Sequence, residues 1–235
     1  NEGDEVVING ATYQVPEGGK STVLIAEVAK AEAYHAAYDF GTGSINGTVL
    51  TFALPALQGP AVEMPQPMVA SNTTTSLVFK DLLGTLRLNV TGEGAVKRAV
   101  ISSHGTPIAG VGEVDLNFVG SPALTLDESG SHSVSVDLGE GAELPAAIDL
   151  MLPAKNYSGF VVTLYGTNDE IVSGVEIPAV NVQRGSIAEA EVEFAPGDNT
   201  ETTYLVASIE NNADGNATTW APSSVLYVNG IPVEM

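Results

Sequence analysis

Short runs of apolar and β-branched residues recur along the whole chain, and glycine or proline separates most of them. Runs of this length bounded by turn residues are typical of strands, and many of them at short spacing are typical of a β-sandwich or barrel. The sequence therefore predicts an all-β fold. The expected strands are Val6–Ile8, Thr22–Ala26, Val49–Leu54, Ser76–Phe79, Thr85–Val90, Ala99–Ser102, Gly112–Phe118, Ser133–Leu138, Ala147–Leu152, Phe160–Tyr165 and Val180–Val182.

Two of these runs alternate strictly between apolar and polar residues. In Thr85–Val90 and Ser133–Leu138 every second residue is apolar, so one face of each strand is expected to be buried and the other hydrated. Such half-buried strands are typical of antiparallel sheets. Asn9-Gly10, directly after the first run, predicts a tight hairpin turn.

Two windows depart from the strand pattern. Residues Ala26–Tyr38 are rich in alanine with glutamate and lysine, which favours a helix, although His35–Tyr38 equally suits the start of a strand. Arg184–Ala190 suits a short helical turn.

Prolines divide the chain. Pro55, Pro60, Pro65 and Pro67 interrupt regular structure, and this segment predicts a boundary between a first domain of residues 1–70 and a second of residues 71–195. Residues 196–235 are expected to form a polar C-terminal appendage. It contains two further strand-like runs, Thr202–Ile209 and Ser224–Val233.

The negative charge of the chain argues against two classes of binding partner, nucleic acids and anionic membranes. The chain has 29 Asp and Glu against 8 Lys and Arg, and its formal net charge is −21. Without a basic stripe we expect no binding to nucleic acid or to anionic membranes. Hydrophobic residues make up 44% of the chain, enough for a sizeable core, yet no apolar run approaches the roughly 20 residues of a transmembrane segment.

No catalytic, cofactor-binding or metal-binding motif is present. Cysteine is absent, and His35, His104 and His132 are far apart in the sequence. Ser102-Ser103-His104 places hydroxyl groups beside an imidazole, but adjacency does not supply the geometry of a catalytic triad. Asn212–Asn216 matches half of a calcium loop and lacks the bidentate glutamate. We therefore expect that the protein is not an enzyme and uses no cofactor or metal.

Several longer segments form a pattern when they are taken in order. They are Gly3-Asp4, Asn9–Tyr13, Thr51–Gln58, Pro67–Ser71, Leu77–Gly92, Ile108–Gly110, Leu150–Ala154 and Arg184–Ile187. Together they resemble the fimbrillins of the Bacteroidales, over residues 1 to about 195. Members of that family are similar to tandem transthyretin-like β-sandwiches, are exported as lipoproteins, and polymerise into type V pili or cap and anchor them.

The resemblance implies a fold, a location and partners. It implies two tandem transthyretin-like antiparallel sandwiches at the cell surface, in a fimbrium or at the outer membrane. The expected partners are other pilin subunits and, for an adhesin, a host surface ligand or a glycan. The strand that normally precedes the Gly-Asp segment is missing, as is a cysteine for lipidation, which suggests either proteolytic maturation or a shortened chain.

A sandwich that lacks its first strand exposes unpaired backbone groups and invites strand addition. The sequence predicts that Ser224–Val233 is a donor strand for the first domain of a neighbouring subunit; an alternative is that this tail folds back on its own second domain. We thus expect a structural or adhesive subunit of fimbriae that assembles by strand exchange, with a surface-anchored glycan-binding lipoprotein as the alternative. The candidate donor residues are Val225, Leu226, Tyr227, Val228, Ile231 and Val233.

Overall fold

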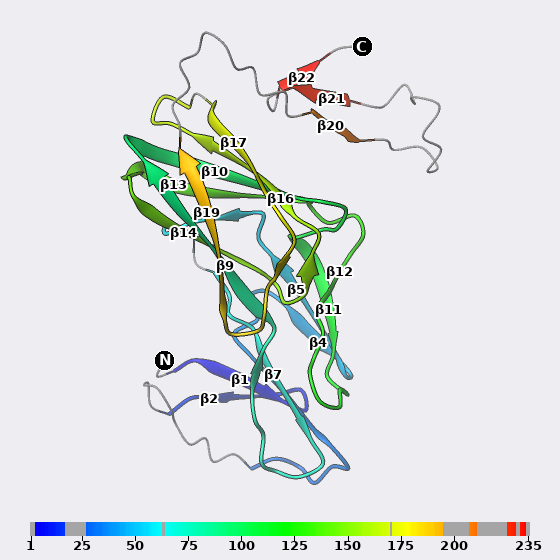
Figure 1. The fold of residues 1–235 in the computed structure, drawn as a ribbon. Helices are drawn as coiled ribbons and strands as arrows, with labels where there is room; N and C mark the ends of the chain where they lie inside the picture. Colours follow the sequence, from blue (N-terminus) through cyan, green and yellow to red (C-terminus); the bar gives the residue numbers. More distant parts are fainter. Residues whose placement is uncertain are drawn as a thin grey trace.

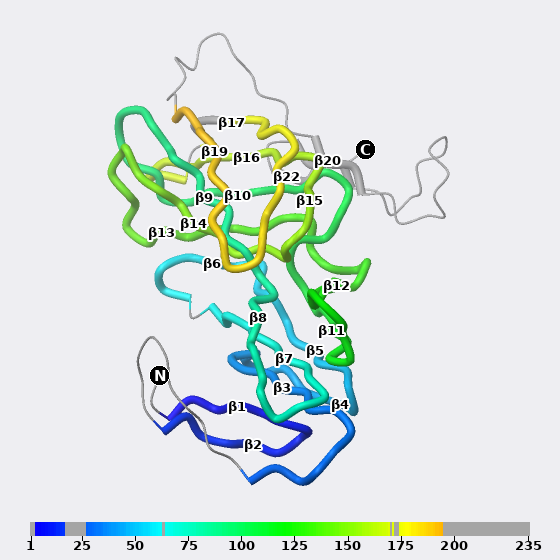
Figure 2. The backbone as a smooth tube through the Cα atoms, turned by 60° about the horizontal axis from the view of Figure 1, so that its bottom comes forward, coloured from blue at the N-terminus to red at the C-terminus, as the bar shows by residue number. Residues whose placement is uncertain are grey.

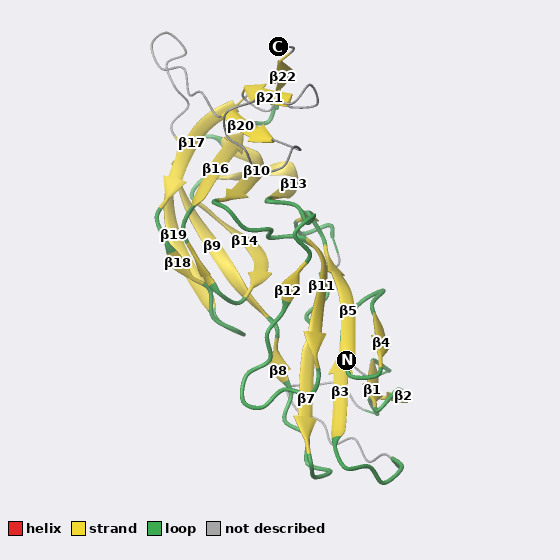
Figure 3. Ribbon diagram, turned by 90° about the vertical axis from the view of Figure 1, so that its right-hand side faces the viewer, coloured by secondary structure: helices red, strands yellow, loops and turns green. Residues whose placement is uncertain are grey.

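The computed structural model describes residues 3–16, 27–62, 64–169, 171–194, 207–210, 225–228 and 231–233. Every regular element within these ranges is a β-strand, and most strand pairs are antiparallel (Figures 1 and 3). The predicted all-β fold is confirmed. The molecule is elongated, with the sheet that contains β1 at one end and the strands that follow β19 at the other (Figure 1).

Two sheets pack face to face in the half of the molecule that we call the C-terminal sandwich. Apolar residues of both sheets share one buried core, and alternate residues of β9 and β13 point into it, as their alternation predicted. The first sheet has the order β17 (Ile171–Ile177), β16 (Phe160–Tyr165), β10 (Ala95–Ser103), β13 (Ser133–Glu143), β6 (Leu57–Gln58). The second has the order β14 (Ala146–Pro153), β9 (Leu83–Gly92), β19 (Ile187–Phe194). A two-stranded pair, β15 (Asn156–Tyr157) and β18 (Val180–Asn181), lies outside both.

The other half, the N-terminal lobe, also consists of two sheets. Its two apolar clusters include Phe52 and Leu54 in one and Val6 and Ile8 in the other. One sheet has the order β2 (Ala11–Gln14), β1 (Glu5–Ile8), β3 (Tyr34–Tyr38), β7 (Met68–Asn72), β8 (Lys80–Asp81). The other has the order β12 (Thr125–Leu126), β11 (Gly110–Asp115), β5 (Val49–Leu54), β4 (Ser44–Asn46).

The expected boundary at residue 70 does not separate these sheets. Strands β11 and β12 come from beyond it, yet β11 pairs with β5 over six residues, and the two lie side by side in Figure 2. Val114 and Leu116 are buried in the same cluster as Leu50 and Phe52. The hairpin after β10 therefore returns to complete the N-terminal lobe, because β5 needs a partner on that side.

Both helical expectations are wrong within the described residues, and the alternative that His35–Tyr38 belongs to a strand is confirmed. Residues 27–33 form no regular structure and Tyr34–Tyr38 is strand β3, paired with both β1 and β7. Ala36 and Ala37 are completely buried there, so tertiary packing of small side chains overrides the helical propensity of alanine. Gly185, with φ of 59°, makes a turn and β19 starts at Ile187.

Of three other local expectations, one is confirmed, one is wrong and one lies outside the described residues. Asn9 and Gly10 both have positive φ, 47° and 82°, and they connect β1 to β2 as the predicted hairpin turn. Residues 76–79 are not a strand but a loop that leads into β8. The expected strand at residues 22–26 lies outside the described residues.

The tail forms a small sheet of its own. Strand β21 (Val225–Val228) pairs with β20 (Ala207–Glu210) on one side and β22 (Ile231–Val233) on the other. A single strand was expected from Ser224 to Val233. The structure instead has two antiparallel strands, one before and one after Asn229-Gly230. The transthyretin-like topology and the donor role remain predictions.

Candidate functional site: open strand edges and the junction between the lobes

In an all-β protein, sheet edges are the surfaces where backbone groups can bind another strand. Three strands longer than four residues end a sheet among the described residues: β14, β17 and β19. The edge strands of the N-terminal lobe, by contrast, are four residues long or shorter. The long edges formed by the described strands thus all belong to the C-terminal sandwich.

At Met151 the edge of β14 is covered by one side chain, that of Gln58. The Gln58 carboxamide oxygen accepts a hydrogen bond from the Met151 N–H at 2.8 Å, and its nitrogen donates to the Met151 carbonyl at 3.1 Å. Gln58 is 1% exposed and also donates to the Pro55 carbonyl at 3.3 Å. Its amide therefore takes the place that a neighbouring strand would occupy at Met151.

Strand β19 has a different edge. It runs parallel to β9, and its burial alternates: Val192 and Phe194 are buried in the sandwich core, whereas Glu189 and Glu191 are exposed. A groove of about 200 Å³ lies between this edge and the segment that follows β17. The groove is lined by Glu176, Ile177, Pro178, Ala179, Val180, Glu189, Ala190 and Glu191.

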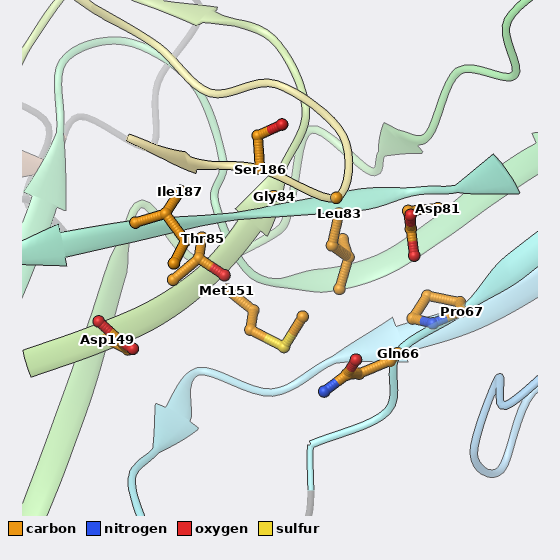
Figure 4. Close-up of a pocket in the computed structure, with 11 residues that line it drawn as sticks. Gln66, Pro67, Asp81, Leu83, Gly84, Thr85, Asp149, Met151, Ser186 and Ile187 are labelled. Carbon is orange, nitrogen blue, oxygen red and sulfur yellow. The ribbon is translucent and has the colours of Figure 1, made fainter. Parts of the chain in front are cut away.

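A second hollow, of about 400 Å³, lies at the junction between the lobes (Figure 4). Leu83 and Met151 point into this space from β9 and β14, and Gln66 and Pro67 face them from the other side. Further lining residues are Asp81, Gly84, Thr85, Asp149, Gly185, Ser186 and Ile187. The lining holds no aromatic ring on which a sugar could stack.

One of the two carboxylates that line this junction, that of Asp149, is paired with Arg87. Arg87 Nε and Nη2 donate to the two Asp149 carboxylate oxygens, each at 2.7 Å, in a bidentate ion pair. The hydrogen bonds to Asp149 raise the pKa of the Arg87 guanidinium above its usual value. This pair bridges β9 and β14, so it reinforces the sheet.

The histidines and serines noted in the sequence do not form a catalytic arrangement. His35 Nδ1 lies 2.8 Å from the Leu116 carbonyl and 3.2 Å from Ser71 Oγ, which connects the two sheets of the N-terminal lobe. Ser102 Oγ bonds Ser133 Oγ at 2.7 Å, and Ser103 Oγ donates to the Thr106 carbonyl, so neither hydroxyl bonds His104.

The remaining candidates from the sequence are a metal site and the donor strand. The described residues contain no group of three or more His, Asp or Glu side chains placed to hold a metal ion. The half calcium loop at Asn212–Asn216 lies outside the described residues. The candidate donor residues are in β21 and β22, where Leu226 faces Val233 and Val228 faces Ile231 in the ladder.

Within the described part of the chain, no helix is long and apolar enough to cross a membrane. The contact of Gln58 with the edge of β14 is a feature that sequence reasoning missed. A single Gln after a proline carries no motif, so its role becomes visible only once β6 is placed beside β14.

Comparison with known proteins identifies the fold. No protein-family model matches the sequence, and no curated protein matches it. Two crystal structures, each of a "putative cell adhesion protein", are similar to the chain. The first, from Bacteroides ovatus, has a TM-score of 0.57 and 15% identity over 83% of both chains. The second, from Bacteroides uniformis, has a TM-score of 0.53 and 13% identity over 83% of this chain and 87% of the other.

Proposed function

We propose that this protein is a non-enzymatic adhesive subunit on the surface of a bacterial cell. One observation carries the proposal: its fold matches, over most of both chains, two Bacteroides proteins named for cell adhesion. The side chains of Ser102, Ser103 and His35 agree with this proposal, because each is engaged in a structural contact.

The finer proposal is that the chain is a fimbrial subunit of the type V class that assembles by strand exchange. It is supported by the resemblance of the segments Thr51–Gln58 and Leu77–Gly92 to fimbrillins, and by long edge strands beside an appendage that contains β-strands. The donor is the strand region of residues 225–233, and its partners are other subunits of the same or a related type. In this proposal the protein is exported and anchored to the outer membrane or incorporated into a fimbrium.

The proposal is tested by following assembly of the purified chain. Light scattering and electron microscopy should reveal chains of subunits whose length increases with protein concentration. A matched chain that ends at residue 214 should stay monomeric. Assembly that is unaffected by this truncation, or a complete absence of assembly together with saturable binding of one polysaccharide on a glycan array, would contradict a fimbrial role; the second result would favour the glycan-binding alternative.

A further inference from the structure

The carboxylate of Asp81 has no cationic partner in its own chain, although two cations are close to it. Within the described part of the chain it accepts no hydrogen bond and forms no ion pair. Lys80, the preceding residue, instead donates a hydrogen bond to the Gly120 carbonyl. Arg184 donates to the Pro122 carbonyl. Both cations are thus engaged by the loop that follows β11, and the charge of Asp81 is left for an external partner.

The position of this carboxylate is fixed by a turn of the backbone. Gly185 has φ of 59°, and a β-carbon at this position would lie 2.5 Å from Asp81 Oδ2. Glycine therefore leaves the space that the carboxylate occupies. The Gly185 N–H donates to the Leu83 carbonyl at 2.9 Å, which holds the turn against β9. The Asp81 side chain is accordingly confined to the wall of the hollow between the lobes.

The two ends of this hollow differ in charge. Figure 4 shows Asp81 beside Leu83 at one end and Asp149 at the other, with Met151 between them. Asp149 is already bound by Arg87 through two hydrogen bonds. An external cation therefore finds an unpaired carboxylate at the Asp81 end.

The wall between the two ends is apolar. Leu83 and Met151 pack in the same apolar cluster of the N-terminal lobe and point into the hollow. Ile187, which also lines it, is 51% exposed. The volume of about 400 Å³ lies within the range of roughly 300–1,000 Å³ that is typical of ligand sites. A matching ligand combines a cation with an aliphatic chain.

We propose that this hollow binds the side chain of a lysine on a partner protein, with the ammonium group at Asp81 and the aliphatic stem along Leu83 and Met151. Lysine has a compact cation on a flexible apolar stem, which fits this arrangement. A second copy of this chain is an unfavourable partner, because each copy has a net charge of −21, whereas a basic protein surface is attracted. The inference names a partner chemistry for the adhesive role proposed above and rests on that role.

The test is a titration of the isotope-labelled full-length chain, followed by NMR. The probe is Nα-acetyl-lysine N-methylamide, which presents a lysine side chain without charged termini. We expect the amide signals of Leu83, Gly84, Thr85 and Ser186 to shift, with a dissociation constant in the millimolar range. The norleucine derivative has the same stem without the ammonium group and should bind about tenfold more weakly or worse, because hydrogen bonds between charged groups are the stronger ones. Equal binding of the two probes would overturn the proposal.

A pair of variants tests the role of Asp81. Asp81→Asn keeps the size of the side chain and removes its charge, and it should weaken binding of the lysine probe about tenfold. Glu113→Gln, at an exposed position of β11, removes one charge elsewhere and should leave binding unchanged. An equal loss in both variants would mean general attraction to an acidic surface and would refute the site. Methylammonium that binds as tightly as the lysine probe would refute the role of the apolar wall.

The outcomes separate this site from the proposed function. If subunits assemble as tested above but the lysine probe shifts no signal of the hollow, the site is wrong and the fimbrial role stands. If the probe binds at the hollow of the wild type and not of Asp81→Asn, while the chain neither assembles nor adheres to a protein-coated surface, the site stands and the adhesive role fails.

Discussion

Single polar side chains connect strands of different sheets in this protein. Gln58 bonds both backbone groups of Met151 from a fully buried position, and so connects β6 to β14 across the junction. His35 similarly connects Ser71 to the carbonyl of Leu116 between two sheets. None of these partners is near in sequence, so residue type alone could not predict them.

Replacing Gln58 should destabilise the fold. The variant Gln58→Leu replaces the carboxamide with an apolar side chain of similar size and leaves the Met151 N–H and C=O without their partner. An unsatisfied buried group costs about 1–3 kcal/mol, and we expect a loss of that order in the free energy of unfolding, measured with denaturant. Gln14→Leu, at an exposed position of β2, is the matched control and should change it little. Equal stability of both variants would refute the role of Gln58.

The hydrogen bond between Tyr38 and Asp4 should make stability sensitive to high pH. Tyr38 donates to the Asp4 carboxylate, and this bond, with partial burial and the charge of Asp4, raises the pKa of Tyr38 to about 12. Because the folded pKa exceeds the usual value near 10, the contribution is fully present below about pH 10 and is lost as pH rises through about 12.

Tyr38→Phe provides the measurement. The difference in the free energy of unfolding between wild type and this variant should shrink between about pH 10 and pH 12. The buried Tyr157, whose pKa is raised by desolvation, is present in both proteins and cancels in the difference. A difference that stays constant through this window would show that the hydroxyl of Tyr38 does not titrate as described.

At the scale of elements, the alternation of apolar and polar residues was sufficient to predict a strand and its buried residues where one face is buried and the other is hydrated. Leu86, Leu88 and Val90 are completely buried, as their spacing in β9 predicted. The pattern failed for β3, where both faces are covered and small alanines fit between neighbouring strands. It also failed to reveal which edges are free, because pairing depends on partners far along the chain.

Removing the appendage should leave the rest of the molecule intact. Strands β20, β21 and β22 pair only with one another among the described strands, so a chain that ends at residue 198 keeps both sandwich sheets and their core. We expect its free energy of unfolding to stay within about 0.5 kcal/mol of the full chain in dilute solution, measured with denaturant. A marked loss of stability in the monomer would instead support fold-back of the tail onto its own second domain.

At the scale of the whole molecule, sequence order and spatial grouping differ. Among the described residues, the buried apolar core of the C-terminal sandwich draws only on residues between Leu86 and Phe194. The larger cluster of the N-terminal lobe combines Leu50 and Phe52 with Val114 and Leu116. Prolines marked a plausible boundary near residue 70, but the return of β11 and β12 to β5 is a long-range pairing for which no local signal exists.

This grouping predicts the behaviour of a fragment of residues 71–195. Its sheet β14-β9-β19 and the strands β17, β16, β10 and β13 retain all their mutual partners, so the sandwich should fold. Strand β11 loses β5, its partner from Gly110 to Asp115. Val114 and Leu116 also lose the members of their cluster that precede residue 71, among them Leu50 and Phe52. Strand β6 is also absent, which exposes the edges of β13 and β14.

Hydrogen exchange on the fragment and on the full chain measures this directly. Amides of β9, β10 and β16 should stay protected in both, whereas those of residues 110–115 should be protected only in the full chain, because exchange reports local opening. The control within the same fragment is β16, whose partners β10 and β17 are both retained. Protection of residues 110–115 in the fragment would mean that the second half of the chain is an independent domain with the boundary that its prolines suggest.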